Sequence, residues 1–153
     1  MKTLNKQLEE LETKIVKHNE VNEEVSKSTV GWQIEHILLT INLIIQEIEK
    51  SNPIAYKSSF KLSKIIVFTF KKIPRGKARA PKAVTPKEYN AQTLKEHLQN
   101  TISKIKSLET IDANKYFDHP YFGNIKVNKA IKFLEIHTNH HLKIINDIVK
   151  PNT

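Results

Sequence analysis

Apolar residues recur every three or four positions in four stretches of the chain, which is the spacing of helices with one buried face. Thr29 or Ser28 is placed to cap the second helix, and Pro53 follows its end. Thr85 is placed to cap the third, with Pro86 at its first position. The predicted helices cover residues 3–21, 29–50, 86–108 and 126–149. Four such helices favour an all-α fold, a four-helix bundle.

Three other segments depart from this pattern. Residues 58–72 are rich in β-branched and aromatic side chains but have no evident partner strand, so we expect a short helix or an extended cover over the core. Residues 71–86 form a basic, proline-bearing loop with no packed core of its own. The aromatic stretch 112–124 is expected to be a structured loop. The bundle thus carries an additional segment and a basic loop between its second and third helices, in a single domain, 1–153.

Composition narrows the classes of function. Absence of cysteine excludes disulfides, thiolate metal ligands and a cysteine nucleophile. The formal charge is +9, but arginine occurs only at Arg75 and Arg79, so we favour a lysine-rich solvated surface over a nucleic-acid interface. The N-terminus has no apolar core of signal-peptide length, and no apolar run reaches the ~20 residues of a membrane span. We therefore expect a cytoplasmic protein without a membrane partner.

The last predicted helix carries a cluster of histidines. His137 and His141 project onto its apolar face from consecutive turns, whereas His140 falls at the edge of that face. Two imidazoles at this spacing can bind one metal ion, and two buried imidazoles without partners would be costly. Pairs with this spacing also occur by chance on helix surfaces, so the pair alone leaves both interpretations open.

The second predicted helix supplies a candidate third ligand, His36. Gln33 and Thr40 share its polar strip, and Trp32 flanks that strip, which is typical of a pocket lining; His140 is expected at the rim of the same pocket. The alternative is that the strip is simply exposed. Glu47 lies about 16 Å along the helix axis from His36, too far to share a metal ion.

Three motifs in this order resemble the DinB-like superfamily of metal-binding four-helix bundles. They are Val30-Gly31-Trp32-Gln33-Ile34-Glu35-His36-Ile37-Leu38, His119-Pro120-Tyr121-Phe122-Gly123 and His137-Thr138-Asn139-His140-His141-Leu142. The second motif is similar to a subfamily of unknown function. The resemblance implies that His36, His137 and His141 bind a divalent metal ion, Zn²⁺, Ni²⁺, Mn²⁺ or Fe²⁺, with an open position for water or substrate. Residues 58–82 match no motif of that family.

The resemblance also implies a function, a metal-dependent enzyme of thiol transferase or hydrolase type. Its substrate would be a small molecule, with a low-molecular-weight thiol as a possible cosubstrate, and homodimers are common in the family. We identify no general base, since Glu35 is expected to face water and Glu47 is too distant.

Two alternatives stay open. One is a non-catalytic binding module that contacts an acidic partner through the basic loop 71–82. The other is a bundle whose metal is purely structural, with His140 or His119 as fourth ligand. We expect His119, Pro120 and Gly123 to form a structural loop, with His119 locking the turn, and His18 and His97 to face solvent.

Overall fold

The computed structural model describes residues 1–76 and 80–150, and this part of the chain is mostly helical. It forms five α-helices and one small antiparallel sheet. The elements are α1 (Lys2–Lys14), α2 (Val30–Lys50), α3 (Leu62–Phe70), α4 (Ala91–Ile105), β1 (Tyr116–His119), β2 (Gly123–Lys126) and α5 (Val127–Ile148). The predominantly helical class predicted from the apolar spacing is confirmed, whereas the two strands were not predicted.

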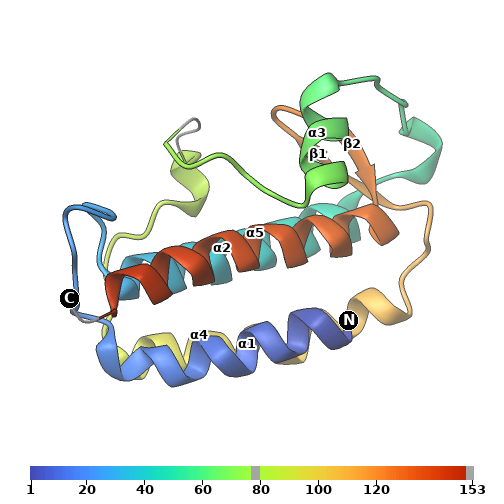
Figure 1. The fold of residues 1–153 in the computed structure, drawn as a ribbon. Coiled ribbons are helices and arrows are strands. Elements are labelled where there is room, and N and C mark those ends of the chain that lie inside the picture. The colour runs from blue at the N-terminus through green and yellow to red at the C-terminus, as the bar shows by residue number, and fades with distance from the viewer. Residues whose placement is uncertain (77–79, 151–153) are drawn as a thin grey trace.

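The four long helices enclose the core. Helix α1 packs against α4 and α5, and α2 packs against the same two helices from the other side. Figure 1 shows α2 and α5 side by side in one layer, with α1 and α4 in a second layer beneath them. Each helix contributes fully buried apolar side chains to a connected cluster, for example Leu8, Ile34, Leu98 and Leu134.

Helix α1 is shorter than predicted. Its α-helical part ends at Lys14 and continues as a 3₁₀ turn over Ile15–Lys17. A 3₁₀ turn holds three residues rather than 3.6, so the side chains after Lys14 rotate relative to the helical pattern. Val16, which the pattern assigned to the apolar face, is accordingly 83% exposed. His18, expected to face solvent, is half-buried, and its Nδ1 lies 3.1 Å from the carbonyl oxygen of Ile15.

Helix α4 begins five residues later than the predicted Pro86. Asn90 caps it in a reciprocal capping box with Thr93, with both hydrogen bonds at 2.9 Å. The Thr85 hydroxyl, the expected cap, instead donates to the carbonyl of Pro81. Pro86 is buried in the connection before the helix. The prediction of this helix start was therefore wrong, because a second capping sequence follows a few residues downstream.

Helix α3 and the hairpin β1–β2 lie over the α2–α5 layer, on the side away from α1 and α4 (Figure 1). The helix confirms the first of the two possibilities for residues 58–72. The structured loop predicted over 112–124 contains strand β1 and the turn of the hairpin, in which His119 pairs with Gly123. Gly123 has φ +65°, and a Cβ there would come within 2.3 Å of the Ser59 hydroxyl oxygen, so both the turn and its contact with the α3 segment require glycine.

The basic loop between α3 and α4 packs against α2 near its C-terminal end. Residues 82–84 form a 3₁₀ turn, and Val84 is only 3% exposed. Arg79 lies outside the described residues. No helix within residues 1–76 and 80–150 has the length and apolar character required to span a bilayer.

Candidate metal centre

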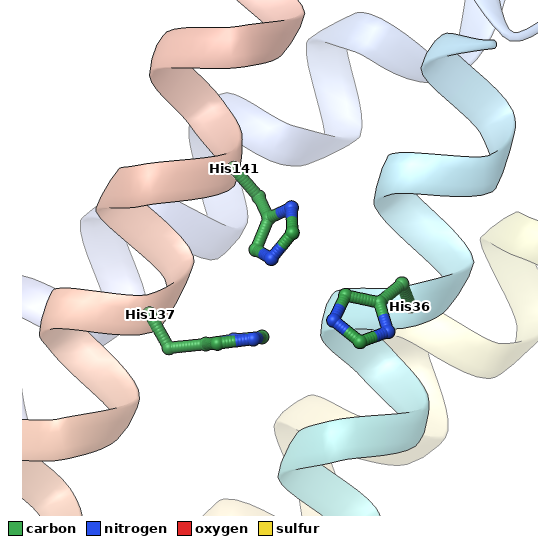
Figure 2. Close-up of side chains that lie close together, drawn as sticks. All are labelled: His36, His137 and His141. Atoms are coloured by element: carbon green, nitrogen blue, oxygen red, sulfur yellow. The ribbon is translucent and has the colours of Figure 1, made fainter. Parts of the chain in front are cut away.

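Three buried imidazoles meet between α2 and α5. His36 projects from α2, and His137 and His141 project from consecutive turns of α5 (Figure 2). Each residue offers a ligand nitrogen, and these three atoms all lie within 4.8 Å of one another. The ring centroids are 4.5–5.1 Å apart. One divalent ion can be bound by three nitrogens placed in this way.

Two of the three rings are oriented by hydrogen bonds through Nδ1. His36 Nδ1 donates to the carbonyl oxygen of Val84 at 2.7 Å, and His141 Nδ1 donates to Oε1 of Gln33 at 2.6 Å. An imidazole that donates through Nδ1 keeps the lone pair on Nε2, the usual arrangement behind a metal-binding histidine. Both rings are thus held in the tautomer that a metal ion requires.

The third ring has an unsatisfied nitrogen. His137 Nδ1 is buried and has no hydrogen-bond partner among the described residues. An unpaired buried polar atom costs about 1–3 kcal/mol, so its presence beside two other imidazoles needs an explanation. A metal ion bound through Nδ1 of His137 would give this nitrogen a partner.

Burial keeps these histidines neutral. Desolvation holds the pKa of His137 and His141 well below the usual 6.5, and the neighbouring imidazoles lower both further. The pKa of His36 is also lowered by burial, although its bond to the Val84 carbonyl opposes the shift. Neutral imidazole is the form that binds metal, so no proton has to be displaced at neutral pH.

A cavity of about 450 Å³ lies beside the three histidines. The residues predicted to line the pocket, Trp32, Gln33, Thr40 and His140, all line it. The Trp32 indole stacks on the His36 ring with the centroids 5.1 Å apart and the planes 15° from parallel. The Thr40 hydroxyl donates to the main-chain carbonyl of His36.

The rest of the cavity wall was not predicted. The hairpin and α5 add the aromatic side chains Phe117, Phe122 and Phe133, and the α3 segment adds Val67. The carbonyl of Val84, which orients His36, was also missed. A main-chain oxygen has no side-chain signature, and only the fold brings residue 84 to residue 36.

His119 occupies the turn of the hairpin. Its ring stacks on Phe122 with the centroids 4.1 Å apart, and its Nδ1 accepts the main-chain N–H of Tyr121. Burial, assisted by the nearby charge of Lys64, lowers its pKa from 6.5 to about 4. Pro120 beside it lines the cavity. His119 therefore fastens the turn that forms one wall of the cavity.

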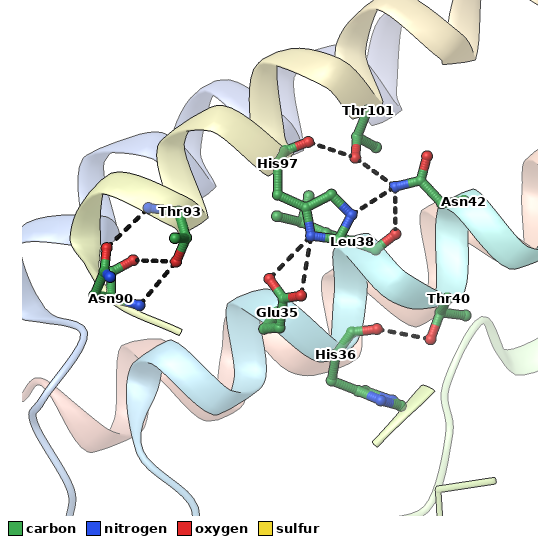
Figure 3. Close-up of polar contacts among 9 residues, drawn as sticks. All are labelled: Glu35, His36, Leu38, Thr40, Asn42, Asn90, Thr93, His97 and Thr101. Atoms are coloured by element: carbon green, nitrogen blue, oxygen red, sulfur yellow. Dashed lines mark hydrogen bonds and ion pairs between the residues drawn. The ribbon is translucent and has the colours of Figure 1, made fainter. Parts of the chain in front are cut away.

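The opposite side of α2 carries a second polar cluster (Figure 3). Glu35, expected to face water, instead meets His97 of α4 together with Asn42. Both carboxylate oxygens of Glu35 lie 3.0 Å from His97 Nδ1, and the Asn42 amide lies 2.9 Å from His97 Nε2 and 2.7 Å from the Thr101 hydroxyl. The expectation that His97 and Glu35 face solvent was wrong, since α4 packs against α2 at this point.

No family model, no curated protein and no solved structure matches this chain.

Proposed function

We propose that the protein is a metal-dependent enzyme whose divalent ion is bound by His36, His137 and His141. The observation that carries the proposal is the convergence of three neutral imidazoles beside a cavity, with one buried nitrogen left without a partner. A divalent ion bound there would lower the pKa of a coordinated water or thiol and supply a nucleophile at neutral pH. Zn²⁺, Ni²⁺, Mn²⁺ and Fe²⁺ are all compatible with imidazole ligands.

The donor set favours a catalytic site over a structural one. Structural sites are normally closed by four protein ligands, whereas the described residues bring three donors together. Neither of the two candidate fourth ligands, His119 and His140, is among these clustered donors. The adjacent cavity leaves room for a substrate at the fourth position.

We further propose that the chain is a DinB-like four-helix bundle. The ordered motifs Trp32-x₃-His36, 119–123 and His137-x₃-His141 support this, as does the pairwise packing of α1, α2, α4 and α5. That membership implies thiol transfer or hydrolysis, and homodimers are common in the superfamily. With no cysteine in the chain, a thiol would have to come from a small cosubstrate.

The residues of the chain then have defined tasks. Val84 and Gln33 hold two ligand rings in the required tautomer. The aromatic wall of Phe117, Phe122 and Phe133 restricts water and packs against the apolar part of a substrate.

Metal analysis tests the site. Tag-free protein, as purified and after incubation with Zn²⁺, Ni²⁺ or Mn²⁺, is measured by mass spectrometry alongside His36→Ala, His137→Ala and His141→Ala. We expect near one equivalent, lost in all three variants and kept in His97→Ala, a control histidine outside the cluster. Absence of metal under every loading condition would contradict the site.

A substrate screen tests the chemistry. The metal-loaded protein is assayed with thiol cosubstrates and with hydrolase substrates. Any activity found should be lost on chelation and restored by the metal. Activity that survives in His36→Ala or His141→Ala would refute the catalytic role of the metal, and the metal analysis would still decide whether the unmutated protein binds one.

A further inference from the structure

Helix α3 points its apolar side away from the protein. Leu62 and Phe70 are 64% and 68% exposed, and Ile65 and Ile66 are each 44% exposed. With 3.6 residues per turn, these four side chains share one side of the helix. A surface helix normally turns its large apolar residues to the core, so four of them exposed on one side of α3 need an explanation.

Contacts on the inner side hold α3 in this orientation. Val67 is buried against the core, and Phe68 packs edge-on against Phe122 of the hairpin. The Lys64 ammonium also points inward and donates to the carbonyl of Asn124 at 3.1 Å. Helix α3 therefore uses Lys64, Val67 and Phe68 to contact the protein and still exposes four large apolar residues on its outer side.

The same part of the chain carries the positive charge of the protein. Residues 50–87 contain eleven lysines and arginines and no aspartate or glutamate. The remainder of the chain has 14 basic against 16 acidic residues, so the net charge of +9 comes from this segment. Exposed lysines, Lys61, Lys71 and Lys72, flank the apolar side of α3 at both ends.

We propose that this surface docks the protein on an anionic lipid bilayer. Leu62, Ile66 and Phe70 would enter the boundary between headgroups and acyl chains, and the flanking lysines would meet the lipid phosphates. An exposed apolar helix side bordered by lysines is the usual form of such interfacial binding, which is distinct from a membrane span. The proposal is independent of the metal site, and it replaces the expectation from the sequence of a protein without a membrane partner.

Charge argues against a second copy of the chain as the occupant. A twofold interface places the same patch on both subunits, so two lysine-bordered surfaces would face each other with no acidic residue from 50–87 to offset them. A bilayer containing anionic lipid offers the complementary charge together with an apolar layer.

Vesicle cosedimentation tests the proposal with the full-length chain. We expect binding to vesicles of equal parts phosphatidylglycerol and phosphatidylcholine, at least about tenfold weaker binding to phosphatidylcholine alone, and a decrease with rising salt. Ile66→Ser combined with Phe70→Ser should weaken binding at least about tenfold, because it removes two large apolar groups from the interface. Both side chains are exposed, and circular dichroism verifies that the fold is retained.

Matched variants locate the surface. Val16→Ser combined with Val21→Ser removes two exposed valines elsewhere and should leave binding unchanged. Lys71→Glu with Lys72→Glu should weaken binding, whereas Lys104→Glu with Lys106→Glu, at the C-terminal end of α4, should have a much smaller effect.

Three outcomes would overturn the proposal. The first is no binding to the anionic vesicles at low salt. The second is binding that the Ile66→Ser and Phe70→Ser pair leaves intact, which would mean adsorption by charge alone. The third is a dimer in sedimentation velocity that Phe70→Ser disperses, without vesicle binding, which would assign the surface to a second copy.

Discussion

Two sides of helix α2 carry polar strips that look alike in sequence but differ in how their hydrogen bonds are satisfied. On one side, His97 has a partner at each ring nitrogen, Glu35 at Nδ1 and Asn42 at Nε2. On the other, His36 and its two neighbours from α5 turn ligand nitrogens toward one another, and His137 Nδ1 has no partner within the described structure. In the first cluster both ring nitrogens of the histidine are paired, and Asn42 Oδ1 is the atom left without a partner; in the second, a ring nitrogen itself is unpaired.

The difference teaches how a buried histidine can be interpreted. A carboxylate and an amide can satisfy an imidazole, so the α2–α4 cluster contributes to stability without a ligand. Three neutral imidazoles in one site cannot all form hydrogen bonds with one another. The free-energy cost of an unpaired buried nitrogen is tolerated where a site has a function. His97 is half-buried and is the single histidine of its cluster, whereas the three imidazoles of the other site are buried. The chemical difference between the two sites lies in the partner of each nitrogen.

The largest expected effect is on metal-dependent stability. At zinc 100-fold above its dissociation constant, binding should stabilise the native state by about 2.7 kcal/mol and raise Tm by about 5–10 °C. His36→Ala should abolish this increment, because loss of a ligand exceeds the roughly 10–100-fold affinity loss typical of supporting residues. Differential scanning fluorimetry with and without zinc measures it.

The matched control is His97→Ala. This variant should lower the Tm of the metal-free protein yet keep the full zinc increment. If the zinc-dependent rise in Tm is lost in His97→Ala as well as in His36→Ala, the two sides of α2 do not differ in metal binding.

The next effect concerns the residue that orients His141. Gln33→Ala removes the acceptor of its Nδ1–H and should weaken zinc binding by about 10–100-fold. Gln33→Glu keeps an acceptor and should restore binding. Competition with a chromogenic chelator measures the affinity. Asn42→Ala, on the other side of the helix, should leave the affinity unchanged, and an equal loss there would refute a specific role for Gln33.

A smaller effect, of opposite sign on the two sides, is expected for the metal-free protein. His97→Leu leaves the half-buried Glu35 carboxylate without its partner and should cost about 2 kcal/mol. His137→Leu removes an unpaired buried nitrogen and should stabilise by about 1 kcal/mol. Urea unfolding with chelator present measures both. Equal destabilisation by the two variants would contradict the unsatisfied state of His137.

The last prediction concerns pH and the cavity wall. The pKa of His119 is about 4 in the folded protein, against 6.5 ordinarily, so the unfolded chain takes up this proton first. The stability contributed by neutral His119 is therefore present above pH 6.5 and is lost as the pH falls from 6.5 to about 4. His119→Phe, which keeps a ring to stack on Phe122, should reduce the change in the free energy of unfolding between pH 6.5 and about pH 4. Urea unfolding of the metal-free protein across this range measures it, and an unchanged profile would show that His119 is not a source of the slope.

Several features of the fold and site were predictable because they depend on neighbours in sequence. Thr29 caps α2, accepting the N–H of Trp32, as its position before the apolar pattern indicated. His137 and His141 lie four residues apart, so one helix brings their rings together whatever surrounds it. Placement of His36 on the polar strip of its helix followed from the same period.

Other features depend on contacts between distant residues and could not be predicted. The start of α4 was assigned to Thr85, although Asn90 provides the cap, since two capping sequences compete and only packing selects one. The hairpin places His119 against Phe133, and the loop before α4 brings the Val84 carbonyl to His36. No local pattern encodes these pairings.

The sequence by itself determined that Glu35 and His36 project from different sides of α2, because each residue advances about 100° around a helix. It also determined that His137 and His141 share one side of α5. Only the tertiary structure decided that Glu35 contacts His97 of α4, while His36 faces α5 and lines the cavity. The period of a helix sets the directions of its side chains relative to one another, but packing chooses the neighbour that each direction meets.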